Sequence, residues 1–258
     1  MMLCKGVMHM GMEKTVNEIV VWLQEQVKDA GVKGLITGVS GGLDSAVVAH
    51  LMKRAAPDNS LGAILPIQTK AADLSHAEKV INSCGINAIT VDLTETHSTM
   101  YEQMKSLLKE KNEFHDKNDQ LAGANLRARL RMSALYTLAT NYNYLVVGTD
   151  NASEWYTGYF TKYGDGGVDI QPIIDFSKQE VRDMASYLGV PDEVVNKQPS
   201  ADLWEGQTDE IEMGTTYEKI DAYVQGKDVP EADKVIIERM HQNTEHKRNP
   251  LPQFRRNR

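Results

Sequence analysis

Short apolar runs alternate with longer helical patterns along most of this chain. The runs are rich in β-branched residues and are bounded by polar or glycine-containing segments, as is typical of buried strands. Four strands are predicted: Gly34–Val39, Leu61–Ile67, Ile86–Leu93 and Tyr144–Thr149. Strands separated by helices pair in parallel. The pattern therefore predicts an α/β fold, a doubly wound parallel sheet with helices on both faces.

Apolar residues at helical spacing predict the connecting helices. The expected helices are Glu13–Ala30, Asp44–Ala55, Asp73–Gly85, His97–Lys111, Ala124–Tyr142, one that opens with a capping box at Ser177 and Glu180, and one that starts near Pro230. The remaining long segments are expected to be loops of the kind that often form lids or bind ligands: Asn112–Gly123, Tyr163–Val168 and Gln198–Met213.

Composition limits the class of protein. The chain has 258 residues, 41% of them hydrophobic, which is enough to bury a sizeable core. We expect a single domain at residues 13–258 and a short N-terminal extension at 1–12, with Met12 as an alternative start. The net charge of −8 argues against a dedicated nucleic-acid binder. No run is apolar enough to span a bilayer or act as a secretory signal, so no membrane partner is expected. Two cysteines, Cys4 and Cys84, give no disulfide framework and favour a reducing cytoplasm.

The segment SGGLDS, from Ser40 to Ser45, joins the first predicted strand to a helix. In doubly wound sheets, ligands bind at the carboxyl ends of the strands. Successive N–H groups from Ser40 to Gly42 can form an anion-binding nest, and the following helix adds its positive end. The sequence lacks both G-x-x-x-x-G-K-[ST] and G-x-G-x-x-G, so neither the usual P-loop nor the dinucleotide fingerprint applies. An ordinary Ser/Gly turn remains the alternative.

Asp44 is unusual at a phosphate site, because a carboxylate repels a polyphosphate unless a cation lies between them. Mg²⁺ binds few protein carboxylates together with phosphate oxygens, so Asp44 is a candidate magnesium ligand. Glu154, in the segment GTDNASE after the fourth strand, offers a second carboxylate at the same edge of the sheet. Thr149 offers a hydroxyl there.

The segment SGGLDS resembles the PP-loop of the N-type ATP pyrophosphatases, which split ATP into AMP and pyrophosphate. Two further segments, FTKYGDGG (160–167) and EHKR (245–248), extend the resemblance along nearly the whole chain. Together they resemble the ammonia-dependent NAD synthetases. That resemblance implies an adenine nucleotide alpha hydrolase-like, Rossmann-like fold and a homodimer. It also implies a ligase that amidates deamido-NAD to NAD, the final step of NAD biosynthesis. An acyl-adenylate forms, and AMP and pyrophosphate are released.

The resemblance also implies roles for individual residues. Asp44, Glu154 and Lys178 would be catalytic, with Asp44 and Glu154 as ligands of Mg²⁺. The residues expected to bind the co-substrate ATP are Gly38, Val39, Ser40, Gly41, Gly42, Leu43, Asp44, Ser45, Thr149, Lys178 and Ser200. The residues expected to bind deamido-NAD are Arg129, Lys162, Asp169, His246 and Lys247. Neither cysteine has a recognisable amidase context, so free ammonia or a separate partner would supply the nitrogen.

Several of these residues also have ordinary structural explanations. Arg129 lies between Arg127 and Arg131 and could be one charge of a solvated helix face. Asp169 could stabilise its glycine-rich turn. The basic tail residues could favour a helix C-terminus. Lys178 could be a surface lysine in a first helical turn, and Ser200 could belong to a turn.

Two other functions remain open. The first is another PP-loop enzyme, one that thiolates tRNA or forms GMP. A thiolating enzyme would need catalytic cysteines and a basic face, and a GMP-forming enzyme would lack the FTKYGDGG and EHKR pair. The second is a nucleotide-sensing module without chemistry, which would not need Asp44, Glu154 and Lys178 together.

Overall fold

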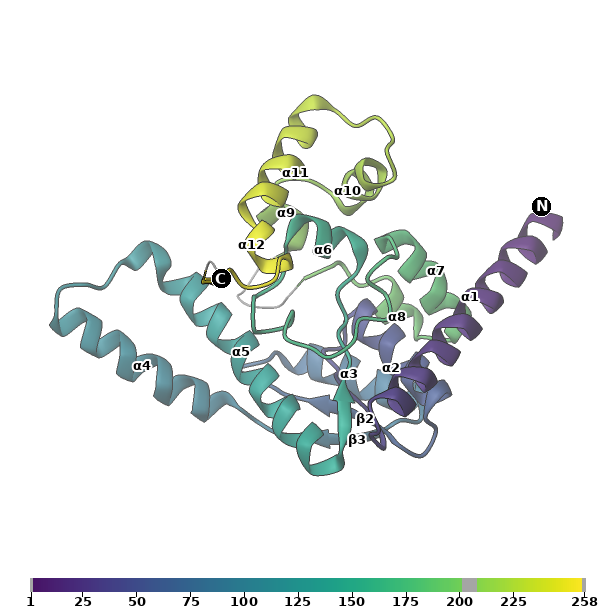
Figure 1. Ribbon diagram of the computed structural model, residues 1–258, viewed down its shortest axis with the longest axis horizontal. Helices are drawn as coiled ribbons and strands as arrows, with labels where there is room; N and C mark the ends of the chain where they lie inside the picture. Colours follow the sequence, from purple (N-terminus) through teal and green to yellow (C-terminus); the bar gives the residue numbers. More distant parts are fainter. Residues whose placement is uncertain (1, 201–207, 257–258) are drawn as a thin grey trace.

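The computed structural model describes residues 2–200 and 208–256, with side chains from residue 11 onward. Within these residues, four parallel strands form one sheet in the order β3-β2-β1-β4 (Figure 1). The strands are β1 (Gly34–Gly38), β2 (Ser60–Ile64), β3 (Asn87–Thr90) and β4 (Tyr144–Val146). Leu35 aligns with Ser60 of β2 on one side and with Leu145 of β4 on the other. The parallel pairing predicted from the sequence is confirmed.

This strand order creates a switch point between β1 and β4. The chain adds β2 and β3 on one side of β1 and then returns to place β4 on the other side. The loops after β1 and β4 therefore diverge and leave a crevice at the carboxyl ends of the two strands. Thr37 Oγ1, fully buried, donates to the carbonyl of Val147 at 2.9 Å and ties the two strand ends together.

Helices cover both faces of the sheet. They are α1 (Met2–Asp29), α2 (Leu43–Ala55), α3 (Ala71–Cys84), α4 (Thr94–Glu110), α5 (Asp116–Tyr142), α6 (Ala152–Thr157), α7 (Lys178–Leu188), α8 (Asp192–Val195), α9 (Asp209–Met213), α10 (Tyr217–Val224), α11 (Glu231–Asn243) and α12 (Glu245–Arg248). Helices α1, α2, α3, α7 and α8 share one core with the first face. Helix α5 packs on the second face, and the doubly wound prediction is confirmed.

Several predicted helix ends are confirmed. Gly85 ends α3 in a left-handed conformation, with φ of 65°, and its N–H bonds to the carbonyl of Ile81. Such a conformation is cheap for glycine and costly for residues with a Cβ. Ser177 and Glu180 form the predicted capping box of α7, and Pro230 precedes α11.

The predicted loop at Asn112–Gly123 is wrong, because α5 already begins at Asp116. This first part of α5 is polar and lacks the apolar spacing that marks a helix against a core. It projects from the body of the molecule beside α4 (Figure 1). Asp119 instead anchors it to α4, since its carboxylate accepts hydrogen bonds from Tyr101 and from Lys105, the latter at 2.7 Å.

The predicted helix Glu13–Ala30 is longer in the structure, because α1 starts at Met2. The expected domain boundary between residues 12 and 13 therefore falls inside this helix. The loop at Tyr163–Val168 is confirmed. In the predicted loop Gln198–Met213, residues 201–207 lie outside the described residues, and 209–213 form α9. Among the described helices, none is long and apolar enough to cross a membrane.

Candidate active site

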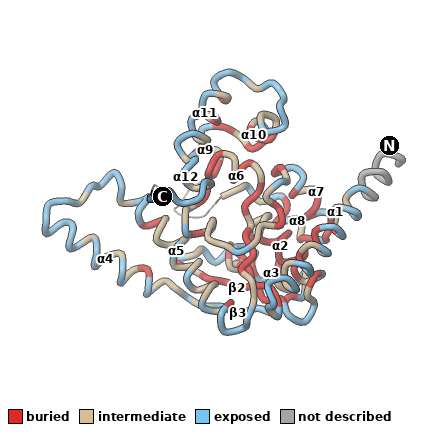
Figure 2. Tube along the Cα trace, in the orientation of Figure 1, coloured by how far each residue is buried: buried red, intermediate tan, exposed pale blue. Residues whose placement is uncertain are grey.

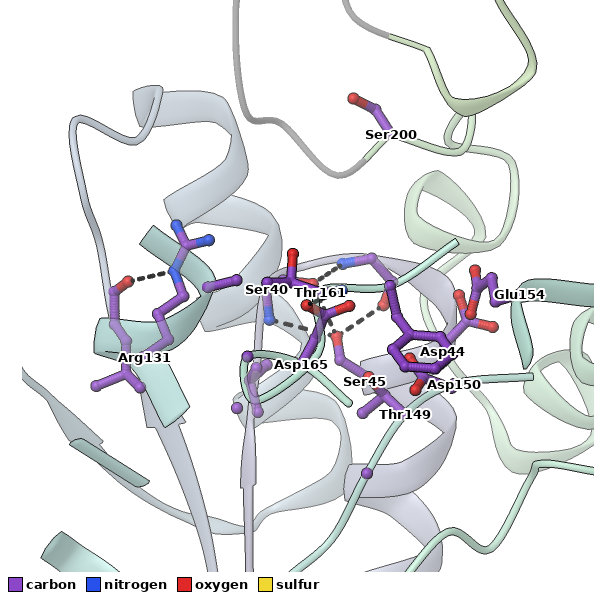
Figure 3. A pocket seen from close by; sticks show the side chains of 18 of the residues that line it. Ser40, Asp44, Ser45, Arg131, Thr149, Asp150, Glu154, Thr161, Asp165 and Ser200 are labelled. Carbon is purple, nitrogen blue, oxygen red and sulfur yellow. Dashed lines mark hydrogen bonds between the residues drawn. The ribbon is translucent and has the colours of Figure 1, made fainter. Parts of the chain in front are cut away.

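A cavity of about 410 Å³ opens at the crevice between β1 and β4. The residues predicted to bind ATP line it with one exception: Gly38, Val39, Ser40, Gly42, Leu43, Asp44, Ser45, Thr149, Lys178 and Ser200. In Figure 3, Asp44, Thr149 and Glu154 lie on the same side of the cavity, whereas Ser200 lies apart from them on another segment. The structure thus gathers residues that are more than 100 positions apart in the sequence.

Gly41 is the one predicted ATP-binding residue that does not line the cavity, and its backbone conformation shapes the loop. Its φ is +80°, and a Cβ there would lie 2.8 Å from the carbonyl oxygen of Asp73. Only glycine tolerates both the positive φ and the close contact with the backbone of Asp73, and a left-handed backbone is suited to an anion-binding nest. The loop is held by its own hydroxyls: Ser45 Oγ lies 3.1 Å from Ser40 Oγ and donates to the carbonyl of Gly42. Among the described residues, no side chain caps the N-terminus of α2, whose first residues line the cavity, so its amide groups are available to an anion there.

The predicted catalytic residues meet in one ion-pair cluster. Lys178 Nζ lies 2.6 Å from Asp44 Oδ2 and 3.2 Å from Glu154 Oε1. The Lys178 side chain is only 5% exposed. Burial by itself would lower the pKa of Lys178, but the two carboxylates outweigh it and raise that pKa. Lys178 is therefore a permanent buried cation and not a surface residue.

Glu154 combines a structural and a chemical role. Its Oε2 accepts the N–H of Asn151, and the side chain of Asn151 accepts the N–H of Glu154, which forms a capping box at the start of α6. Asn151 Nδ2 also donates to Asp44 Oδ1 at 3.0 Å. The N-x-x-E spacing of residues 151–154 is a helix-start signal that could have revealed Asn151 from the sequence.

Burial raises the pKa values of two carboxyl groups in this part of the cavity. Desolvation raises the pKa of Glu154 to about 7, against the opposing effect of Lys178. Desolvation also raises the pKa of Asp150 well above its usual value, and the carboxylates of Asp165, Glu154 and Asp44 add to the rise. Strongly perturbed carboxyls in a cavity are typical of functional sites.

Four of the five residues predicted to bind the dinucleotide lie close together. Arg129 Nε donates to the carbonyl of Lys162, and Lys162 Nζ donates to the carbonyl of His246 at 2.6 Å. Lys247 Nζ lines the cavity and donates to the carbonyls of Gly158 and Phe160. The FTKYGDGG and EHKR segments are therefore in contact, although Arg129, Lys162 and His246 lie outside the cavity lining. Burial lowers the pKa of Lys247.

Asp169 is placed differently from the other four. Its carboxylate accepts from the hydroxyl of Tyr136 at 2.9 Å and from the N–H of Val146 at 2.8 Å. It holds its loop to β4 and does not line the cavity, so its contact with the dinucleotide stays a prediction. Asp165, four residues earlier in the same turn, does line the cavity. No pattern in GDGGVD tells which of the two carboxylates faces the ligand.

The sequence reasoning also missed Asp150, Asp209 and Tyr217. Asp209 is buried and lines the cavity, and Tyr217 Oη lies 3.0 Å from its Oδ2. The sequence predicts a loop around Asp209 and no element around Tyr217. The local signal near each is a residue that caps a helix in the structure, Thr208 for α9 and Thr216 for α10.

The charge of the lining matters for a nucleotide ligand. Of the described residues around the cavity, seven are Asp or Glu and four are Lys or Arg. A polyphosphate would meet net repulsion there without an added cation. Within the described residues, no group of three or more His, Cys, Asp or Glu could hold a metal alone. Two adjacent carboxylates that need further oxygens from elsewhere fit Mg²⁺, which takes one or two carboxylates plus phosphates and waters.

Comparisons with known proteins agree on one family. The family model described as NAD synthase matches residues 15–251. A relative from Alkaliphilus oremlandii, named NH(3)-dependent NAD(+) synthetase, is 55% identical over 95% of this chain and 98% of its own. The solved structure of NMN synthetase from Francisella tularensis has a TM-score of 0.85 and 36% identity, covering 94% of this chain and 98% of that one. The NH3-dependent NAD synthetase from Campylobacter jejuni, in complex with nitrate, has a TM-score of 0.74 and 26% identity, covering 95% and 99%.

The family model spans most of the chain, and it includes the PP-loop segment, the ion-pair cluster and the EHKR segment. The same residues build the cavity between β1 and β4. The chain therefore belongs to the NAD synthase family.

Proposed function

We propose that this chain amidates deamido-NAD to NAD, with ATP and ammonia as co-substrates. The observation that carries the proposal is the cluster of Asp44, Glu154 and Lys178 beside an uncapped helix N-terminus, in the cavity of a NAD synthase family member. The nicotinate carboxylate attacks the α-phosphorus of ATP, the bond from that phosphorus to the bridging oxygen breaks, and pyrophosphate leaves. Ammonia then attacks the acyl carbon, and AMP leaves as NAD forms.

The chain's own groups suit the first of these steps. A carboxylate is already a nucleophile, so adenylation needs alignment and charge neutralisation more than a catalytic base. The amide groups at the start of α2 and the hydroxyls of Ser40 and Ser45 can hold the departing pyrophosphate. Lys178 brings a fixed positive charge, which its two carboxylate partners keep protonated.

Magnesium belongs to the proposal as the cation that the cavity needs. Asp44 and Glu154 are the residues that would hold it. When bound, Mg²⁺ would offset the negative charge of the phosphates. A reducing cytoplasmic location is also part of the proposal, since the chain has only two cysteines and Cys84 is a free thiol.

The stoichiometry of products tests the proposed function. Protein incubated with ATP, Mg²⁺, ammonium and deamido-NAD should form NAD, AMP and pyrophosphate in equal amounts. ATP is split between its α- and β-phosphates in an adenylation, so ADP should not accumulate. Formation of ADP, or a folded sample that makes no NAD, would contradict the proposal. Omission of ammonium is the control, and it should stop NAD formation.

Nicotinate mononucleotide is a second candidate acceptor. The Francisella structure named NMN synthetase shares 36% identity with this chain at a TM-score of 0.85. The same adenylation and amidation applied to the mononucleotide would give NMN. The product assay should therefore be run with each acid separately, and we expect the higher kcat/KM with the dinucleotide.

We also propose a homodimer that buries the projecting pair α4 and α5. Met100, Met104, Leu107 and Leu108 follow helical spacing on α4, and each is at least 40% exposed. Leu121 on α5 is 56% exposed as well, although it also belongs to the cavity lining. Figure 2 shows α4 exposed along most of its length. A contiguous apolar face of this kind is typical of a protein interface, and the resemblance to the family supports a second copy as the occupant.

A charge on that face should break the dimer. We expect the double variant Met104→Glu, Leu107→Glu to sediment as a monomer at micromolar concentration, because two carboxylates would be buried without partners. Val235 on α11 is 53% exposed outside the apolar face, so Val235→Glu is the control that should leave the mass unchanged. A wild-type monomer, or a double variant that stays dimeric, would contradict this interface.

A further inference from the structure

Helix α10 contacts both helices that carry catalytic side chains. It packs against α6, which bears Glu154, and against α7, which bears Lys178. Two of its residues, Tyr217 and Asp221, are spaced four apart and so lie on the same face. Both are buried, with 4% and 8% of their surface exposed. Neither belongs to the predicted site.

Asp221 joins the two helices by bonding to backbone amides of α7 and to a side chain of α6. One carboxylate oxygen accepts the N–H of Lys178 at 3.2 Å, and the other accepts the N–H of Gln179 at 3.3 Å. These are the first two amides of α7, which the capping box of Ser177 leaves open. The first oxygen also accepts from Ser153 Oγ, one residue before Glu154 on α6. A carboxylate at a helix N-terminus is stabilised there by the helix dipole.

Tyr217 joins the same two helices by contacting one side chain from each of them, Glu154 of α6 and Lys178 of α7. Its Oη lies 2.9 Å from Glu154 Oε1 and 3.0 Å from Asp209 Oδ2. Its ring lies under the ammonium of Lys178, with 4.5 Å from Nζ to the ring centroid. A cation over a ring face is attracted to it, more strongly where water is excluded. One tyrosine therefore touches both the carboxylate and the ammonium of the ion-pair cluster.

We propose that α10 is the positioning element for adenylation, in which Asp221 fixes the start of α7 against α6 and Tyr217 fixes the side chains of Glu154 and Lys178. The inference rests on the proposed function. Glu154 and Lys178 come from separate helices, and alignment is the main contribution of this chain to the step at phosphorus. Since neither α10 residue lies on the PP-loop, both act through the residues they hold.

The variant Tyr217→Phe tests the side-chain half of this proposal. It keeps the ring under Lys178 and removes only the hydroxyl. We expect kcat to fall about 10- to 100-fold, the usual effect of a loosened catalytic group, with KM for ATP near the wild-type value. ATP affinity from titration calorimetry without deamido-NAD should also stay near the wild-type value.

The matched control lies on the same helix. Tyr223 Oη donates to Glu238 Oε1 at 2.8 Å, away from the cavity. Tyr223→Phe removes an equivalent tyrosine–carboxylate bond and should keep the wild-type kcat. If both phenylalanine variants have the same kcat, the hydroxyl of Tyr217 has no positioning role. If the wild-type protein itself makes no NAD, the proposed function has failed.

The variants Asp221→Ala and Asp221→Asn test the backbone half. Asparagine keeps an acceptor oxygen for the amides of α7, whereas alanine does not. With rates divided by the folded fraction at the assay temperature, we expect alanine to lower kcat about 100-fold and asparagine to restore part of it. Loss of activity that disappears after this correction would mean that Asp221 only stabilises the fold and would overturn its positioning role.

Discussion

Replacing Asp44 with asparagine should lower kcat for NAD formation by about 10²–10³-fold while the protein stays folded. The side chains have nearly the same shape, and the asparagine oxygen can still accept from Asn151 Nδ2, which lies 3.0 Å from Asp44 Oδ1. Lys178 would keep Glu154 as a partner. What disappears is the negative charge that would hold a cation beside the phosphates.

Single-turnover formation of pyrophosphate without ammonium isolates this effect, because adenylation releases pyrophosphate before the attack of ammonia releases AMP. The burst of adenylate should be lost in Asp44→Asn, and the midpoint of urea unfolding should stay near the wild-type value. Asp192→Asn is the control: it changes an exposed aspartate in the first turn of α8, outside the cavity lining. Normal turnover in the Asp44 variant would remove this residue from the mechanism.

The general architecture could be predicted because burial leaves a periodic trace in the sequence. The strands β1 and β2 are buried along their whole lengths, with at most one position partly exposed, and therefore read as continuous apolar runs. The first part of α5 could not be predicted, because it projects from the body and Gly123 is the one buried residue between 116 and 123. Its helical state depends on Asp119 and its contacts with α4, which are tertiary interactions.

The ion-pair cluster of Asp44, Glu154 and Lys178 could be predicted because each member belongs to a short segment with a recognisable local pattern. Asp44 lies in a glycine-rich strand-to-helix turn, and Lys178 lies in a capping box. The resemblance to a known family then connected these segments. Tyr217 and Asp221 had no such signal, because they act from a helix that contacts the site only after the chain has folded.

Asp165 and Asp169 show the limit of local reasoning about a turn. Both stand near the same glycines, yet one lines the cavity and the other bonds to Tyr136 and to the backbone of β4. Which carboxylate faces the ligand depends on the path of the turn after β4. The sequence pattern carries no information on that path.

Replacing Lys178 with methionine should both stop adenylation and destabilise the protein by about 3–5 kcal/mol at neutral pH. The ammonium is the shared partner of two carboxylates whose side chains are only 17% and 13% exposed. Without it, Asp44 and Glu154 would face each other across a largely dry site. Lys79→Met is the control, since Lys79 Nζ lies 2.6 Å from Glu193 Oε2 but both side chains are nearly half exposed. We expect the control to lose no more than about 1 kcal/mol.

The loss in Lys178→Met should grow as the pH rises. In the wild type, the pKa of Lys178 is raised above its unfolded value, so its contribution is fully present from pH 5 to 8 and disappears only at much higher pH. In the variant, the pKa of Glu154, already raised to about 7 by burial, should rise further without the ammonium. The folded variant then binds more protons than its unfolded state, and its stability falls as the pH increases. Urea unfolding should therefore separate variant and wild type more at pH 8 than at pH 5, and an equal separation at both would show that no carboxyl gains a proton when the ammonium is removed.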